Sequence, residues 1–341
     1  MKRLLLLLLT LCLLTGCVGK TVVQNDPTVP NTDTDTNTPQ PAETAVKTGL
    51  ALLTTISKSM NATPDSKGSA RTDTTVVAVT VDGDGIIRAC AIDGITAAVP
   101  FDTEGQLEVE EDTAYPTKNE LGDDYGMHKA SPIGREWDEQ AADFAAWVVG
   151  KRADELESGD VTASVTISTD DFIRAIRSAA DTAVYLGAKA NDRLAIAALA
   201  RLDEAEDAEE DENGKVQCSV SAAAVTFQGD TVTSCLFDGV QTSLTVTHEG
   251  IIPDDLSAVQ LSKNRLGDDY GMKKASSIGK EWYQQAAAFA AYAKGKTVRQ
   301  TAALPTDDDG YLLGADLAAS VTISVSDFVT LLLKAAEGRG V

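Results

Sequence analysis

Two threonines, Thr166 and Thr322, carry the clearest chemical signal in the sequence. Each lies in a motif that occurs twice, as "SVTISTDDF" at 164–172 and as "SVTISVSDF" at 320–328. An apolar run with helical spacing follows each motif, so the threonine is predicted to lie just before a helix N-terminus. Free backbone N–H groups and the helix dipole favour a phosphate at such a place. The motif is therefore a candidate site for a phosphate-bearing group.

The same motif also predicts a capped helix. In each copy a serine is followed three residues later by an aspartate, a pattern typical of a capping box. The β-branched letters "SVTI" predict a short strand that leads into the cap. The two predicted boxes pair Ser168 with Asp171 and Ser324 with Asp327. Capping accounts for these residues and leaves the threonines unexplained.

A glycine-bounded block, "LGDDYGM", is the second candidate, and it occurs at 121–127 and at 266–272. Its adjacent aspartates are the residue type of general acid–base chemistry. Neighbouring carboxylates point in different directions on most backbones, however, so a surface turn is the favoured interpretation. The stretches 82–85 and 306–310 resemble the opening of a calcium loop. They lack the later acidic ligand, so no metal site is predicted.

An internal duplication must position these motifs. Residues 119–151 match residues 264–296 without a gap, and 23 of the 33 positions are identical. Each unit is predicted to contain a helix, a β-hairpin, a further strand, the glycine-rich block, a helix, the short strand and a final helix. The first helix is predicted at 44–60 and 182–202, and the hairpin at 74–93 and 218–238. This order indicates an α+β fold with two tandem repeats of a small, mainly antiparallel sheet with helices.

The middle helix of each unit has one apolar face. Its large and small apolar residues are spaced by four, three and four positions, which places them on one side of a helix. These residues are Trp137, Ala141, Phe144 and Val148 in the first unit, and Trp282, Ala286, Phe289 and Ala293 in the second. We interpret the face as packing surface.

The N-terminus predicts export and a lipid anchor. Met1, Lys2 and Arg3 precede a short apolar run, which is typical of a secretory signal and too short for a membrane span. The run ends in "LTGC", which resembles the bacterial lipobox, so Cys17 is the predicted lipidated residue. Localisation at the cell membrane, on its extracytoplasmic face, follows. The predicted segments are a signal peptide at 1–16, a lipid-anchored disordered spacer at 17–41, repeat 1 at 42–181 and repeat 2 at 182–341.

Charge and composition exclude several classes of function. The formal net charge is −23, which argues against nucleic acid as a partner. The acidic run at 203–214 is predicted to be a solvated loop. Cys90, Cys218 and Cys235 have no metal-like spacing and are expected to be buried as small apolar residues. The chain contains two histidines, so neither a His-dependent hydrolytic triad nor a zinc site is predicted.

The order hairpin, "LG" block, "W..Q" helix, "GK" and threonine motif resembles the FMN-binding domain of the flavin-carrying subunits of Rnf and sodium-pumping NADH:quinone oxidoreductase complexes. It is similar also to the tandem flavinylated lipoproteins of extracellular electron transfer. The resemblance implies FMN joined to a threonine through a phosphoester bond, with an aspartate six residues before it. The cofactor-binding residues that it implies are Thr166, Thr322, Asp160, Asp316, Ser168, Ser324, Tyr125 and Tyr270.

Two functions remain open at this point. The resemblance implies an FMN-carrying electron-transfer lipoprotein with a membrane redox partner, which is a carrier and not an enzyme in its own right. The family's glycine is replaced by Ser164 in one copy and by Ser320 in the other, and this narrows the space for a ligand beside the backbone. The alternative is a non-redox binding or structural lipoprotein of the cell envelope that keeps the fold without the cofactor.

Overall fold

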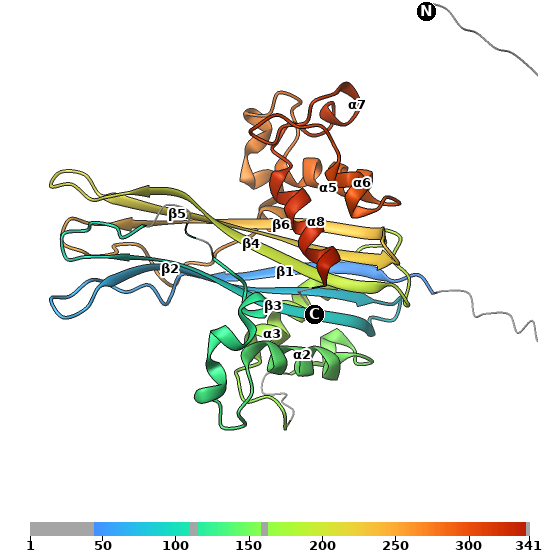
Figure 1. Cartoon of the computed structure of the whole chain (residues 1–341), viewed down its shortest axis with the longest axis horizontal. Helices are drawn as coiled ribbons and strands as arrows, with labels where there is room; N and C mark the ends of the chain where they lie inside the picture. Colours follow the sequence, from blue (N-terminus) through green and yellow to red (C-terminus); the bar gives the residue numbers. More distant parts are fainter. Residues whose placement is uncertain (1–43, 110–112, 114, 158–162, 339–341) are drawn as a thin grey trace, which may run out of the picture. The chain divides into compact units, whose positions relative to one another are not determined.

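The computed structural model describes residues 44–109, 113, 115–157 and 163–338 (Figure 1). The stretch from Glu43 to Val341 forms one compact unit, and this unit contains both repeats. The signal peptide, the spacer, Cys17 and Asp160 lie outside the described residues.

Each repeat contributes one three-stranded antiparallel sheet, and the strands follow the chain order. Sheet 1 contains β1 (Lys47–Thr55), β2 (Gly68–Val81) and β3 (Ile87–Phe101). Sheet 2 contains β4 (Arg193–Glu206), β5 (Gly214–Gln228) and β6 (Thr231–Val246). The predicted hairpins are the pairs β2–β3 and β5–β6. The predicted α+β class with two tandem antiparallel sheets is therefore confirmed.

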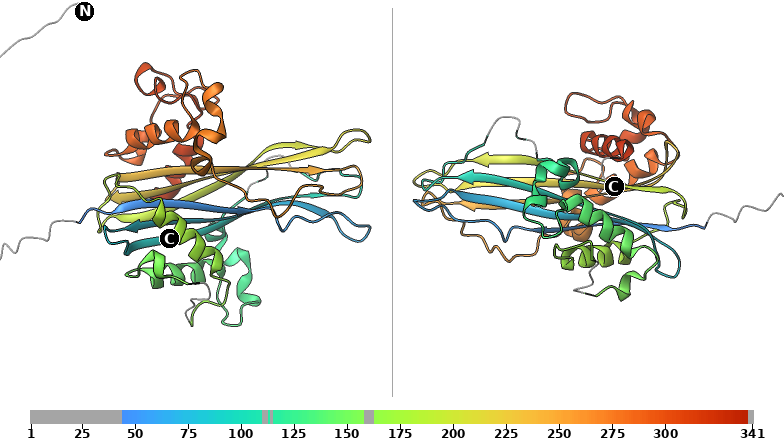
Figure 2. Two further views of the ribbon diagram at one scale, coloured as in Figure 1. Left: turned by 180° about the vertical axis from the view of Figure 1, so that it is seen from behind. Right: turned by 60° about the horizontal axis from the view of Figure 1, so that its bottom comes forward.

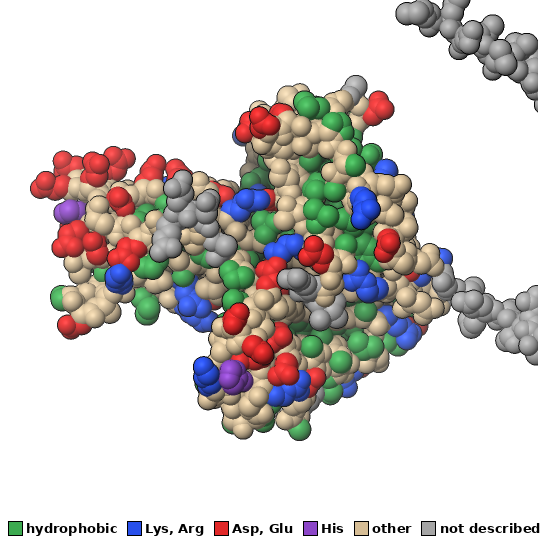
Figure 3. All heavy atoms as spheres, in the orientation of Figure 1, with side chains coloured by type: hydrophobic (Ala, Val, Ile, Leu, Met, Phe, Trp, Pro, Cys, Tyr) green, Lys and Arg blue, Asp and Glu red, His purple; other side chains and the backbone are tan. Residues whose placement is uncertain are grey.

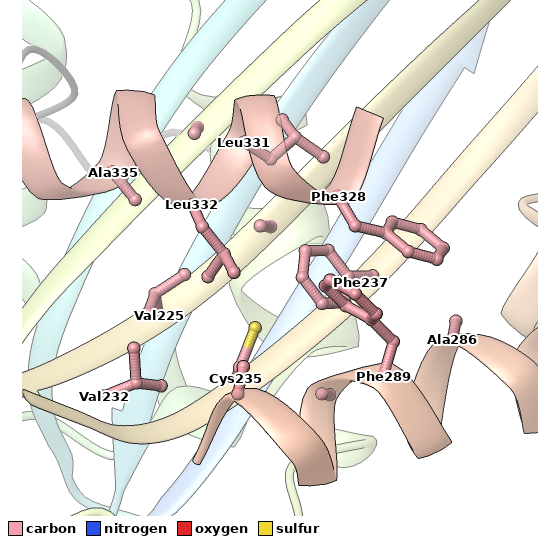
Figure 4. Close-up of a cluster of buried hydrophobic side chains, with 14 of the residues drawn as sticks. Val225, Val232, Cys235, Phe237, Ala286, Phe289, Phe328, Leu331, Leu332 and Ala335 are labelled. Carbon is pink, nitrogen blue, oxygen red and sulfur yellow. The ribbon is translucent and has the colours of Figure 1, made fainter. Parts of the chain in front are cut away.

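Four longer helices cover the outer faces of the sheets (Figures 1 and 2). They are α2 (Trp137–Val148) and α3 (Asp170–Asp181) on sheet 1, and α5 (Trp282–Ala293) and α8 (Ser326–Glu337) on sheet 2. The short α-helices are α1 (Lys118–Leu121), α4 (Lys263–Leu266), α6 (Val298–Ala302) and α7 (Ala315–Ala318), and short 3-10 helices accompany them. The predicted apolar faces of α2 and α5 are buried against the sheets, as Figure 4 shows for Phe289 beside Phe237 and Phe328.

The inner faces of the two sheets pack against each other. Leu50 and Leu52 of β1 share one core with Ile196 of β4. Two buried hydroxyl pairs also join the sheets, Thr48 with Ser234 at 2.6 Å and Thr72 with Thr242 at 2.7 Å. Because each hydroxyl satisfies the other, these polar groups cost little inside an apolar layer. The result is four layers: helices, sheet, sheet, helices.

This packing explains why the predicted first helices are wrong. Residues 47–55 and 193–206 are the strands β1 and β4. In β1, Ala51 faces the helices while Leu50 and Leu52 face the other sheet, so both faces are buried. A strand buried on both faces reads as a nearly continuous apolar run, which hides the two-residue period.

Three smaller expectations are corrected as well. The letters "SVTI" form no strand in either repeat, and the predicted further strand is the continuation of β3 and of β6. The helices α3 and α8 begin after N-cap residues Thr169 and Val325, so the predicted serine caps are misplaced by one residue. The Oγ of Ser324 donates instead to the carbonyl of Asp309 at 2.9 Å.

The strands extend beyond the helices at one end of the molecule (Figure 1). Within the predicted acidic loop, β4 continues to Glu206 and β5 begins at Gly214, so 207–213 alone is a turn. Acidic side chains gather at this end of the molecule, on the left of Figure 3. β1 begins at the opposite end.

Candidate functional site

A buried glutamine from the neighbouring helix holds each motif threonine. The backbone N–H and the Oγ1 hydroxyl of Thr166 both donate to Oε1 of Gln140, at 2.7 and 3.1 Å. Thr322 donates in the same way to Oε1 of Gln285, at 2.7 and 3.2 Å. Both glutamines are completely buried. A buried amide oxygen needs hydrogen-bond donors. The threonine motif supplies them to the glutamine, and the glutamine in turn holds the motif against the helix.

The amide nitrogen of each glutamine reaches a second loop. Nε2 of Gln140 donates to the carbonyl of Arg135 at 3.2 Å and to Oγ of Ser131 at 3.4 Å. Gln285 makes the equivalent two contacts in repeat 2. The glutamine therefore joins the threonine motif to the loop that precedes the helix. This glutamine is the last letter of the "W..Q" pattern in the sequence, but its role in holding the threonine was not predicted.

The threonine hydroxyls remain accessible to different degrees. Thr166 is exposed and Thr322 is half-buried. Each Oγ1 donates its hydrogen to a glutamine and keeps its lone pairs. A phosphoryl group on Oγ1 would remove this hydrogen bond, while the bond from the backbone N–H would stay.

The helix start near each threonine already carries negative charge. The first turn of α3 contains Asp170 and Asp171. In α8, Asp327 lies 2.8 Å from the guanidinium of Arg201 and accepts from Oγ of Ser221 at 3.2 Å. Carboxylates at a helix N-terminus take the favourable position that a phosphate would occupy. This arrangement weakens the predicted phosphate preference there.

A buried glutamate fastens the "LGDDYGM" block to the middle helix. The carboxylate of Glu136 accepts the backbone N–H groups of Met127 at 2.8 Å and of His128 at 3.0 Å. Glu281 does the same with the corresponding residues of repeat 2. The pKa of Glu136 is lower than usual. Burial acts to raise this pKa, but hydrogen bonds from the backbone and ring of His128 and from the backbone of Met127 outweigh the effect of burial.

The predicted tyrosines stack on a lysine. The ammonium of Lys118 lies 5.2 Å from the ring centre of Tyr125 and 4.6 Å from that of Trp137. Lys263 repeats this contact with Tyr270 at 5.2 Å. Burial lowers the pKa of Lys118. The aromatic rings therefore have a cationic partner within the fold, which accounts for their recurrence.

A buried aspartate on each third strand supports the same region. Oδ1 of Asp93 accepts the N–H groups of Gly94 at 2.7 Å and of Asn119 at 3.2 Å. Burial raises the pKa of Asp93 to about 6, although these hydrogen bonds oppose the shift. Asp238 has the equivalent contacts, and burial raises its pKa too. These titratable groups were missed from the sequence.

The remaining predicted residues do not converge on the threonines. Asp316 is exposed on the short helix α7, and Ser168 is exposed beside α3. Cys218 and Cys235 are buried and Cys90 is partly buried, all as free thiols. Burial alone raises the pKa of Cys90 and of Cys235, which favours the protonated thiol over the reactive thiolate.

Each repeat has a groove between its third strand and its middle helix. The groove of repeat 1, here groove 1, has a volume of about 610 Å³, and groove 2 has about 440 Å³. Both lie against the edge strand of a sheet and an alanine-rich helix face. The residues at corresponding positions are Cys90 and Cys235, Asn119 and Asn264, Ala142 and Ala287, Ala145 and Ala290, and Ala146 and Ala291. The motif threonines line neither groove.

No family model, curated protein or solved structure matches this sequence. In the described part of the chain, no helix is long and apolar enough to cross a membrane. Among the same residues, no three His, Cys, Asp or Glu side chains come together as a metal site requires.

Proposed function

We propose that the chain is a lipid-anchored protein of the extracytoplasmic face of the cell membrane and that its folded part is a binding module. The observation that supports the binding role is the groove at the same place in both repeats. A mainly apolar hollow with a few polar groups is the usual form of a small-molecule site. The anchor rests on the sequence "LTGC" at Cys17.

In this proposal the threonine motif is a structural clamp. Gln140 and Gln285 are buried side chains that need donors, and Thr166 and Thr322 supply them. The recurrence of the motif then follows from the duplicated fold. It needs no bound cofactor.

Filling each groove separately tests the binding role. Ala146 and Ala291 are exposed, corresponding residues on the groove walls. A fragment library is screened by ligand-observed NMR against the full chain and against Ala146→Phe and Ala291→Phe. We expect to find fragments whose NMR signals show binding to the wild type but no binding to one of the two filled variants. If neither substitution changes the binding of any fragment, the binding role is contradicted.

The anchor has its own test. Cells that express the full chain are labelled with radioactive palmitate, and the same is done for Cys17→Ala. We expect label and membrane fractionation for the wild type, and neither for the variant. Label that persists in Cys17→Ala would disprove the assignment of the lipid to Cys17.

An FMN-carrying electron-transfer role is the second candidate. The observation in its favour is that Thr166 and Thr322 present their hydroxyls with the same hydrogen bonds in both repeats. The flavin would supply the redox chemistry, and the protein would set its position and potential. A membrane dehydrogenase or the quinone pool would be the redox partner.

Co-expression with a flavin transferase separates the two candidates. The carrier role predicts yellow protein and an added FMN mass on the peptides that contain Thr166 and Thr322. Colourless protein with both threonines unmodified rules the carrier role out as stated. The binding role predicts that second result.

A further inference from the structure

We propose that groove 1 binds a small organic cation, an ammonium group on an aromatic or aliphatic body, and that Asp138 is its counter-ion. The inference rests on the proposed binding role, because it concerns the same groove. It adds the chemical class of the ligand and the residue that selects it.

The charges around groove 1 identify Asp138. The guanidinium of Arg88 is bound to Asp82 at 2.6 and 2.9 Å. Glu120 pairs with Lys334 at 2.7 Å. A second carboxylate on the wall, Glu139, lies 3.6 Å from the guanidinium of Arg135. Asp138 is thus the carboxylate on the wall for which the described residues provide no cation.

The position of Asp138 leaves one oxygen unsatisfied. Its Oδ1 is buried and has no hydrogen-bond partner within the described structure. The side chain belongs to the first turn of α2 and lies under the turn at Gly122, where an added Cβ would be 3.9 Å from Oδ2. A buried acceptor without a donor is unfavourable. An ammonium group in the groove would supply both the donor and the missing positive charge.

The remainder of groove 1 favours an apolar body. Ala142, Ala145, Ala146 and Val149 form its helical wall. Its volume of about 610 Å³ lies within the usual range for small-molecule sites. The ligand class that fits is therefore an amine with a compact hydrocarbon part.

Groove 2 differs at the decisive position. Tyr283 replaces Asp138 there, and its hydroxyl donates to Asp268 at 3.1 Å. Lys294 replaces Val149, so the wall of groove 2 carries a cation. A positively charged ligand is repelled by this lysine. Selection of cations is accordingly a property of groove 1 alone.

Three matched probes test the ligand class. The full chain in detergent is titrated by calorimetry with 2-phenylethylamine, 2-phenylethanol and 3-phenylpropionate. We expect one site for the amine and at least tenfold weaker binding of the alcohol and the acid. Equal affinity for the three probes would overturn the proposal, and so would no binding of the amine at millimolar concentration.

Variants then locate the contact. Asp138→Asn keeps the side-chain size and is expected to weaken amine binding at least tenfold, whereas Asp181→Asn removes one exposed charge elsewhere and is expected to change it less than twofold. Ala146→Phe is expected to abolish binding and Ala291→Phe to leave it intact. Circular dichroism and thermal unfolding confirm that each variant is folded. The proposal is refuted if Asp138→Asn still binds the amine. It is refuted also if Ala291→Phe loses amine binding while Ala146→Phe keeps it.

The outcomes also separate this inference from the binding role on which it rests. Fragments that lose binding in Ala146→Phe but not in Asp138→Asn would sink the cation proposal and leave the binding role standing. If no fragment responds to the filling of either groove, the binding role itself fails.

Discussion

Repeat 1 and repeat 2 keep the same buried polar contacts and differ on the walls of their grooves. The glutamine clamp, the glutamate that holds two backbone N–H groups, and the lysine beneath the tyrosine occur in both. Each has a partner inside the fold, so identity between the repeats is explained by folding. The groove walls differ in charge at Asp138 and Tyr283. If the grooves bind ligands as proposed, this difference in charge would give the two repeats different ligand preferences.

The contacts between the repeats diverged too. Glu120 of α1 pairs with Lys334 of α8 at 2.7 Å. At the corresponding place, Arg265 of α4 donates to Oγ of Ser178 of α3 at 3.1 Å. The short serine leaves a pocket of about 370 Å³ beside Arg265. One contact is thus an ion pair and the other is a weaker hydrogen bond next to a hollow.

The largest expected effect concerns the two outer cores. Phe144 and Phe289 are completely buried at corresponding positions of α2 and α5. Phe144→Ala and Phe289→Ala should each lower the free energy of unfolding by about 3–5 kcal/mol, because each leaves a cavity. Urea unfolding followed by circular dichroism and tryptophan fluorescence measures the change.

These variants also test whether the repeats unfold together. Because the sheets share an inner core, we expect one cooperative transition that both substitutions shift. Two transitions, with only one of them moved by each substitution, would mean that the repeats are independently stable.

The second prediction concerns pH. The pKa of Asp93 is about 6 in the folded protein, against about 3.9 in an unfolded chain. Between these values the folded state keeps a proton that the unfolded state has lost, so this group makes stability fall as pH rises from 4 to 6. Relative to Asp93→Asn, the wild type should lose about 2 kcal/mol between pH 4 and pH 6, out of a total of about 3 kcal/mol. Unfolding free energies at several pH values measure it.

Asp238 provides the matched comparison. Burial also raises its pKa, but the nearby charge of Lys263 lowers it, whereas Glu120 raises that of Asp93. We expect a smaller pH-dependent change for Asp238→Asn than for Asp93→Asn. Parallel profiles of wild type and Asp93→Asn would contradict the raised pKa.

The third prediction compares the two clamps. Gln140 accepts three hydrogen bonds through Oε1, from the N–H and hydroxyl of Thr166 and from the N–H of Ile167. Gln140→Leu should cost about 2 kcal/mol, because it leaves backbone donors without an acceptor. Gln285→Leu should cost somewhat less, since two such bonds are described there. Thermal unfolding measures both.

A milder variant checks the reason. Thr166→Val removes the hydroxyl and keeps the backbone N–H, so we expect a loss below about 1 kcal/mol. If Thr166→Val were as harmful as Gln140→Leu, the hydroxyl would be the essential partner, and the clamp would not be primarily a backbone contact.

The sequence predicted what local periodicity and duplication can encode. Helices α2, α3, α5 and α8 and the two hairpins follow from apolar spacing and turn residues. The strands β1 and β4 were missed because the second sheet buries their other face, and no local pattern reveals that contact. The clamp was missed for a similar reason, because Gln140 and Thr166 are 26 positions apart. Residue types indicated the elements, but the partners across the fold required the structure.

The smallest expected effect concerns the contact between the repeats. Lys334→Ala removes the ion pair with Glu120 and the hydrogen bond to the carbonyl of Ala198, and both lie at a partly buried site. We expect a loss of about 1 kcal/mol that shrinks at high salt. Ser178→Ala in the opposite contact should change stability less than this, since it removes one exposed hydrogen bond to Arg265. Urea unfolding at low and high salt measures both variants. Equal losses, unaffected by salt, would mean that packing of the lysine stem and not its charge holds the repeats at this point.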